Sequence, residues 1–196
     1  MTFLVILLIA IVVHETMHAL VAHKLGDSTS HDMGRITLNP LAHIDLFTTV
    51  LLPIVTFIFF QAPILAAKPV MVDPRNLKYG DMGWALVSIA GPLSNMAMAA
   101  LAAGLIHLGI VPDILLQQVV WFIWLNIGMF VFNMLPIPPL DGSRLLRALA
   151  PEPIQDLMDR FEQMGFAVAI FLLILLMNVI SPLLSNISIA IWRLLF

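Results

Sequence analysis

The sequence contains no cysteine and few charged residues, and both absences narrow what the chain can be. Only 11% of its 196 residues are charged, whereas 61% are hydrophobic. A soluble domain of this size could not cover so much apolar surface with so few charges. The formal net charge of −3 leaves no basic patch for nucleic acid. The composition therefore excludes a disordered chain, a coiled coil, an ordinary cytosolic domain and a nucleic-acid partner, and it indicates an integral membrane protein.

Without cysteine, the chain can form neither a disulfide nor a thiolate metal site. Any transition-metal site must therefore use His, Asp or Glu as ligands.

Long apolar stretches dominate the rest of the sequence. A bilayer core of roughly 30 Å is crossed by about twenty apolar residues in a helix, and the alternating strands of a membrane barrel are missing. We expect an all-α, polytopic helical bundle in the cell membrane, surrounded by the lipid bilayer. The expected stretches cover residues 3–25, 46–67, 84–108, 117–132 and 166–196.

The whole chain, residues 1–196, reads as one membrane-embedded domain. Its core covers about residues 4–150, and Ser181-Pro182 divides the last stretch into a helical pair over about residues 164–196. Arg35–Leu38 alternates like a short membrane-associated strand, and the Asn39-Pro40 step that follows predicts a turn.

The stretch Leu46–Ala67 is interrupted by prolines and has two possible paths. If it spans the membrane, two of the nine Lys and Arg residues lie on one side and seven on the other. If it re-enters on the same side, all nine lie on one side, which the positive-inside rule makes cytoplasmic. Its length suffices to cross. The charges favour the re-entrant path, which puts Lys24 and Lys78 on the same side.

An HExxH motif, His14 to His18, lies inside the first apolar stretch. On a helix, residues four apart share one face, so the two imidazoles can bind one Zn²⁺. Glu15 lies beside them and can take a proton from a zinc-activated water. Ionisable side chains inside a membrane helix are costly, so three together require a functional reason.

A catalytic zinc usually has a third protein ligand. Asp141 is the best candidate, because it follows a proline-rich break that only a buried or wet position would tolerate. Alternatively, Asp141 caps a short amphipathic helix that begins at Ser143. His43 and His31 are competing ligands in the first loop.

Two asparagines are further candidates. Asn133 opens the irregular stretch, where its amide could donate to a developing oxyanion or simply satisfy broken backbone. Asn95 is expected to form a hydrogen bond between helices.

Together these motifs resemble the site-2 protease family of intramembrane zinc metalloproteases, in its compact branch without a PDZ domain. The resemblance covers about residues 4–150, and the combination of HExxH with a membrane-embedded LDG is its most specific part. The matching motifs are HExxH, Gly91-Pro92-x-x-Asn95, Asn133-x-x-Pro136, Leu140-Asp141-Gly142, the stretch Arg35–Asp45 and Lys68-Pro69-Val70.

The resemblance implies one zinc per chain, with His14, His18 and Asp141 as ligands. It further implies that Glu15 is the catalytic base and that Asn133 stabilises the tetrahedral intermediate. The expected substrates are transmembrane proteins or peptides cleaved in or near their membrane segments. Two alternatives are a membrane metal transporter or sensor, which would show repeats that this sequence lacks, and an inactive scaffold, which would not need the glutamate.

Overall fold

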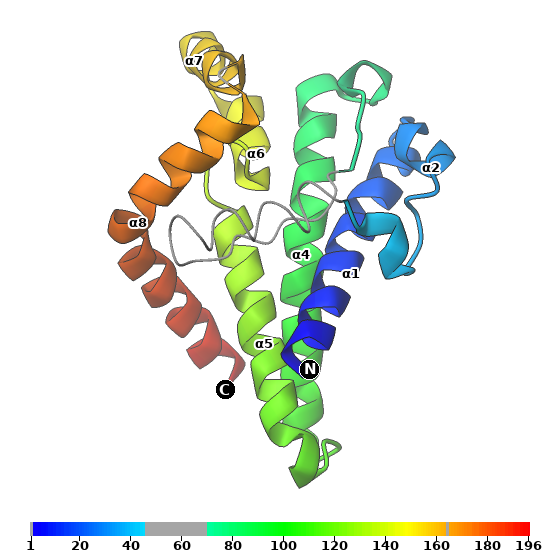
Figure 1. Cartoon of the computed structure of the whole chain (residues 1–196), viewed down its shortest axis with the longest axis vertical. Helices are drawn as coiled ribbons and strands as arrows, with labels where there is room; N and C mark the ends of the chain where they lie inside the picture. Colours follow the sequence, from blue (N-terminus) through cyan, green and yellow to red (C-terminus); the bar gives the residue numbers. More distant parts are fainter. Residues whose placement is uncertain (1, 46–69, 164) are drawn as a thin grey trace.

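The computed structural model describes residues 2–45, 70–163 and 165–196, and within these ranges all regular structure is helical. The long helices stand side by side, with α1 at one side of the molecule and α8 at the other (Figure 1). The elements are α1 (Thr2–Lys24), α2 (Thr29–Asp32), η1 (Pro40–His43), η3 (Pro74–Asn76), α4 (Gly80–His107), α5 (Asp113–Asn133), α6 (Asp141–Leu149), α7 (Glu152–Gln163) and α8 (Phe166–Leu195).

Among the described residues, four helices are long and apolar enough to cross a membrane. Their large apolar side chains are widely exposed, as expected where lipid replaces water around a bundle. The expected all-α fold, with apolar helices of membrane-spanning length, is thus confirmed for the described residues, while the predicted re-entrant segment Leu46–Ala67 lies outside them. These helices of spanning length are Thr2–Lys24, Gly80–His107, Asp113–Asn133 and Phe171–Leu195.

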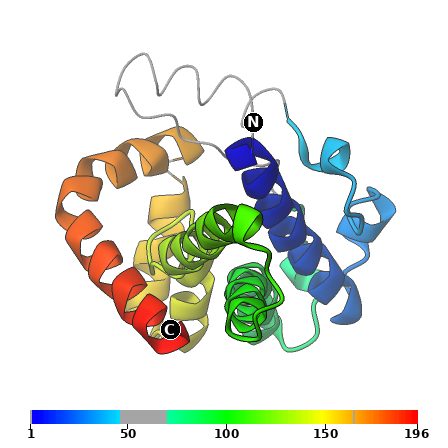
Figure 2. The ribbon, with the colours of Figure 1, turned by 90° about the horizontal axis from the view of Figure 1, so that it is seen from below.

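Helix α4 is the centre of the bundle, since α1, α5 and α6 all pack against it. Its small side chains let α5 approach closely, as is typical of helix pairs in lipid. Ala99 and Ala103 of α4 bury Ile123 and Ile127 of α5, both of which have no exposed surface. Seen from below, α8 lies on the side of α5 away from α1 (Figure 2).

The end of α1 is tied to the segment that precedes α4. Gly26 has a φ of 111°, which lets the chain turn sharply after the helix. Leu25 O then accepts a hydrogen bond of 2.8 Å from Lys78 N. Lys24 and Lys78 therefore lie at the same end of the bundle, as the charge pattern predicts.

A buried carboxylate secures this connection. Asp27 accepts hydrogen bonds from the side chain and backbone of Thr29, from Asp73 N at 2.9 Å and from the Asn76 amide. Burial acts to raise the pKa of Asp27, but these hydrogen bonds outweigh it and hold the pKa below its ordinary value. The charged carboxylate is consequently the form that joins the two segments.

The predicted division of the last stretch is wrong. Pro182 lies inside a single helix, α8, rather than between two, and Figure 1 shows that this helix changes direction along its length. Near the end of α8, Leu195 O lies 2.7 Å from Nε2 of His107, at the far end of α4. Arg193 therefore lies at the opposite end of the bundle from Lys78, and the prediction that all nine basic residues share one side fails at this residue.

The predicted strand over Arg35–Leu38 is also not formed: Arg35 is irregular and residues 36–38 bend. The carbonyl oxygen of Thr37 accepts a hydrogen bond from Thr16 Oγ1 at 2.8 Å and another from His43 Nε2 at 2.9 Å. Side chains, rather than the backbone of a neighbouring strand, therefore satisfy this oxygen. The Asn39-Pro40 turn is confirmed, because the Asn39 side chain caps η1.

The placement of these helix ends predicts the result of a labelling experiment. Because the chain has no native cysteine, single cysteines at Ser28 and Asn76 can be probed without background. Both positions lie at the end of the bundle that the charges make cytoplasmic, so an impermeant thiol reagent should leave both unlabelled in intact cells. A cysteine at Ile110, which is 60% exposed between α4 and α5, should react. Labelling of only one of the first two would contradict this arrangement.

Candidate metal centre

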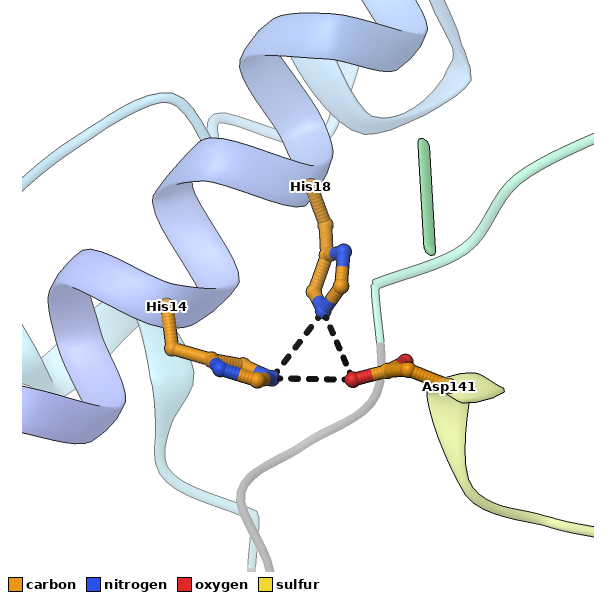
Figure 3. A group of neighbouring side chains, drawn as sticks. All are labelled: His14, His18 and Asp141. Atoms are coloured by element: carbon orange, nitrogen blue, oxygen red, sulfur yellow. Dashed lines mark hydrogen bonds and ion pairs between the residues drawn. The ribbon is translucent and has the colours of Figure 1, made fainter. Parts of the chain in front are cut away.

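Three side chains from two distant parts of the sequence converge inside the bundle. One ligand atom each from His14, His18 and Asp141 lie within 4.8 Å of one another. The two Nε2 atoms are 3.0 Å apart, and Oδ2 of Asp141 lies 3.2 Å from His14 Nε2 and 3.4 Å from His18 Nε2. Figure 3 shows the three atoms pointing toward a common centre. Within the described residues this is the one group of His, Asp or Glu side chains with such a geometry.

Both imidazoles come from one face of α1, because residues four apart in a helix are neighbours on its surface. His14 is 5% exposed and His18 7% exposed. Such burial among apolar helices is unfavourable for polar rings unless their nitrogens have partners. Helix α4 provides these partners. Val87 O lies 2.8 Å from His18 Nδ1, and Asn95 Oδ1 lies 2.6 Å from His14 Nδ1.

The Val87 contact fixes which nitrogen of His18 carries the hydrogen. A carbonyl oxygen only accepts, so Nδ1 of His18 is the N–H donor. In the neutral ring Nε2 then has a free lone pair, and that lone pair points at the centre of the group. A hydrogen bond to the far ring nitrogen is the usual way in which a metal-binding histidine is oriented.

Asp141 reaches this centre because the chain folds sharply before α6. A side chain on Gly142 would place its Cβ 2.3 Å from Met134 O, so only glycine allows this close approach. Arg147 then holds α6 in place through an ion pair of 3.0 Å to Asp81 of α4. The alternative that Asp141 caps the helix is wrong, since Asp141 lies in the first turn of α6 and the cap position has no side-chain hydrogen bond.

Helix α4 approaches both imidazole rings closely at Gly91. A Cβ added to Gly91 of α4 would lie 2.3 Å from His18 Nε2 and 2.7 Å from His14 Nε2. Any side chain there would collide with the ligand nitrogens of both histidines. The absence of a side chain at this position is therefore a requirement of the site.

The spacing of the ligand atoms fits a tetrahedral metal ion. Bonds of about 2.0–2.1 Å at tetrahedral angles separate neighbouring ligand atoms by about 3.3–3.4 Å. The observed separations run from 3.0 to 3.4 Å. Two imidazole nitrogens and one carboxylate oxygen are also the ligand set of a class of catalytic zinc sites, which keep a fourth position open. His14, His18 and Asp141 therefore fit a zinc ion in both spacing and ligand type.

Comparisons with known proteins place the chain in a family. The model of peptidase family M50 matches residues 109–176, which include Asp141. The chain is 38% identical over 184 residues to YwhC of Bacillus subtilis (strain 168), a match that covers 89% of this chain and 81% of YwhC. The chain belongs to peptidase family M50. Membership of this family makes the chain a metalloprotease. No solved structure is a significant match to the chain.

Two further relatives are less similar to the chain than YwhC is. The chain is 28% identical to Rip2 of Mycolicibacterium smegmatis, covering 85% of this chain and 64% of Rip2. It is 28% identical to MJ0611 of Methanocaldococcus jannaschii, covering 68% of this chain and 63% of MJ0611. All three relatives carry names that describe them as zinc metalloproteases.

The two competing histidine candidates of this M50 protein lie apart from the centre. His43 is buried and bonds to Thr37 O, while His31 stacks on His23 and pairs with Asp32 near the surface. Neither is part of the metal-ligating group among the described residues. Asn95 forms the expected hydrogen bond between helices, to Asn126 at 2.8 Å.

The two remaining candidates lie on helices that carry the site. Glu15 is half-buried on α1, next to His14 in the chain. Asn133 is the last residue of α5, and its amide nitrogen donates to Met129 O at 3.0 Å. Asn133 thus satisfies a backbone carbonyl, which is one of the two roles that the sequence suggests for it. The second N–H of its amide remains available for another acceptor.

Three contributions to the centre were not predicted. The backbone oxygen of Val87 carries no sequence signal at all. Gly91 belongs to a motif, but in the sequence it indicates only close helix packing. Asn126 could have been found by asking why α5 places an amide in the middle of a spanning helix.

The space beside Gly91 yields a prediction for the metal content of the M50 protein. Replacing Gly91 with Ala should abolish most metal binding, because the new Cβ would collide with both ligand nitrogens. Alanine favours a helix over glycine by about 1 kcal/mol, so the helix itself is not weakened. Elemental analysis of the purified protein measures the result. The matched control is Gly104→Ala in the same helix, where a Cβ meets no atom within 4 Å. Full metal content in Gly91→Ala would contradict the site.

Proposed function

We propose that this M50 protein is an intramembrane zinc metalloprotease that hydrolyses peptide bonds in or near the transmembrane segments of its substrates. It would hold one zinc per chain through His14, His18 and Asp141. The observation that carries the proposal is the convergence of these three ligand atoms within 4.8 Å, two of them on a helix long and apolar enough to span a membrane.

The choice of zinc rests on the ligand set and on the relatives. Two imidazoles with one carboxylate suit zinc better than hard cations such as Mg²⁺, which prefer oxygen ligands. The names of the relatives specify zinc. When bound, zinc would supply a Lewis acid that acidifies water and polarises a carbonyl group.

Glu15 is the proposed general base. It follows His14 directly on α1 and is not one of the three converging ligands. In hydrolysis Glu15 would take a proton from the attacking water and then pass it to the leaving amine of the cleaved peptide bond. A half-buried carboxylate is suited to both transfers, because it is neither fully screened by water nor closed off from it.

Asn133 is the proposed oxyanion stabiliser. One N–H of its amide is held by Met129 O, which orients the group at the end of α5. The second N–H would donate to the carbonyl oxygen of the scissile bond as negative charge develops there.

Substrate would approach the centre from the side of Asp141. The Asp141 side chain is 22% exposed, compared with 6% for His14 and 9% for His18. The two imidazoles are covered by α1 and α4, so the carboxylate is the accessible edge of the group. A peptide bond can reach it only from an unwound segment, since a helix keeps its carbonyls bonded internally.

Replacing Glu15 with Gln tests the mechanism. The amide keeps the shape of the side chain and removes the base, so zinc content should stay near that of the unchanged protein. Cleavage of a membrane-embedded substrate should fall at least about 100-fold, the lower bound for loss of a general base. Elemental analysis and a cleavage assay in detergent or vesicles measure the two quantities.

Glu152→Gln, at an exposed position on α7, is the control for replacing a glutamate and should change neither quantity. In Asp141→Ala zinc content itself should fall sharply. Retained cleavage in Glu15→Gln, or retained zinc in Asp141→Ala, would contradict the respective assignment.

A further inference from the structure

Two asparagines form a buried chain of hydrogen bonds that ends on the metal centre. Asn126 of α5 and Asn95 of α4 are both completely buried. The amide of Asn126 bonds to Asn95 at 2.8 Å, and Asn95 Oδ1 lies 2.6 Å from Nδ1 of His14. The amides of Asn126 and Asn95 thus connect α5 and α4 to His14 on α1. The other ring nitrogen of His14, Nε2, faces the metal centre.

The first link determines the direction of the whole chain. Asn126 Nδ2 lies 2.8 Å from Phe122 O, one turn earlier in α5, and a carbonyl oxygen can only accept. The amide of Asn126 must therefore turn its nitrogen toward Phe122 and its oxygen toward Asn95. That oxygen accepts from Asn95 Nδ2.

A second carbonyl orients Asn95 independently. Ala10 O of α1 lies 3.3 Å from Asn95 Nδ2, so the amide of Asn95 has two acceptors on its nitrogen side. A flipped amide would place its oxygen against both of them. Asn95 Oδ1 must consequently face His14, and Nδ1 of His14 must be the donor.

We propose that Asn95 and Asn126 are positioning residues that fix the hydrogen of His14 on Nδ1 and so direct the Nε2 lone pair at the metal centre. Asn126 acts only through Asn95. The proposal rests on the proposed zinc site and extends it by two amides, on α5 and α4, that connect to His14 on α1.

The two ligand histidines are therefore oriented by different means. For His18 the acceptor is a backbone oxygen, Val87 O, which no substitution of a side chain removes. For His14 the acceptor is the Asn95 side chain, which depends on Asn126. This difference provides an internal reference, because a change at Asn95 should alter one ring and leave the other unchanged.

The experiment uses the full-length protein in detergent, loaded with zinc and labelled with ¹⁵N-histidine. The unchanged protein should show two slowly exchanging Nδ1–H signals from zinc-bound rings. In Asn95→Leu one of them should be lost by rapid exchange, while the signal of His18 remains. A role limited to holding α4 against α5 would leave both signals in place, and that result would overturn the proposal.

Zinc affinity gives a second readout that does not depend on cleavage. Competition with a chelator should show a loss of about 10- to 100-fold in Asn95→Leu, the usual effect of removing a partner of a ligand. Asn126→Leu should lie between the unchanged protein and Asn95→Leu. The double variant should bind zinc no more weakly than Asn95→Leu alone, since Asn126 acts through Asn95; losses that add would overturn this order.

His107→Leu is the matched control, because it removes a hydrogen bond from α4 to α8 far from the centre. It should leave both signals and the zinc affinity unchanged. If Asn95→Leu does not fold, Asn126→Leu keeps the proposal testable, and an unchanged affinity there would overturn the role of Asn126. Absence of zinc binding in the unchanged protein would instead contradict the proposed function, so the two failures are distinguishable.

Discussion

The arrangement of this protein depends on three electron-rich atoms that face one another inside an apolar bundle. The Nε2 atoms of His14 and His18 and Oδ2 of Asp141 lie 3.0 to 3.4 Å apart. Lone pairs at this separation repel unless positive charge lies between them, and burial strengthens the repulsion. The proposed zinc ion would supply that charge and so link α1 to α6, two helices separated by more than 100 residues of sequence. Peptidase family M50, to which the chain belongs, is in agreement with such a centre.

Helix α4 is the template on which this centre is built. It offers Val87 O to one ring and the Asn95 amide to the other, and it leaves space at Gly91 for the ligand atoms. Its first turn holds α6 through the ion pair between Asp81 and Arg147. The same helix thus orients the histidines and delivers the aspartate, which explains why it lies in the middle of the bundle.

The sequence predicts the parts of this arrangement that depend on local pattern. HExxH predicts that His14 and His18 converge, because helical periodicity alone puts them on one face, and the apolar runs predict the helices of membrane-spanning length. The prediction that the last helix divides at Pro182 is wrong, because a helix in lipid tolerates proline when neighbouring groups satisfy the freed backbone carbonyl. The strand at Arg35–Leu38 failed because tertiary contacts to Thr37 O replaced a ladder partner. The role of Val87 could not be predicted, because every residue type carries the same backbone carbonyl.

The central claim is that one zinc ion is held by His14, His18 and Asp141. An anomalous difference map at the zinc absorption edge, from crystals of the purified protein, tests it most directly. The account predicts a single peak per chain, about 2.0–2.2 Å from Nε2 of both histidines and from a carboxylate oxygen of Asp141. A peak at other residues, such as the His23 and His31 pair, or no peak in protein purified without chelator, would contradict it.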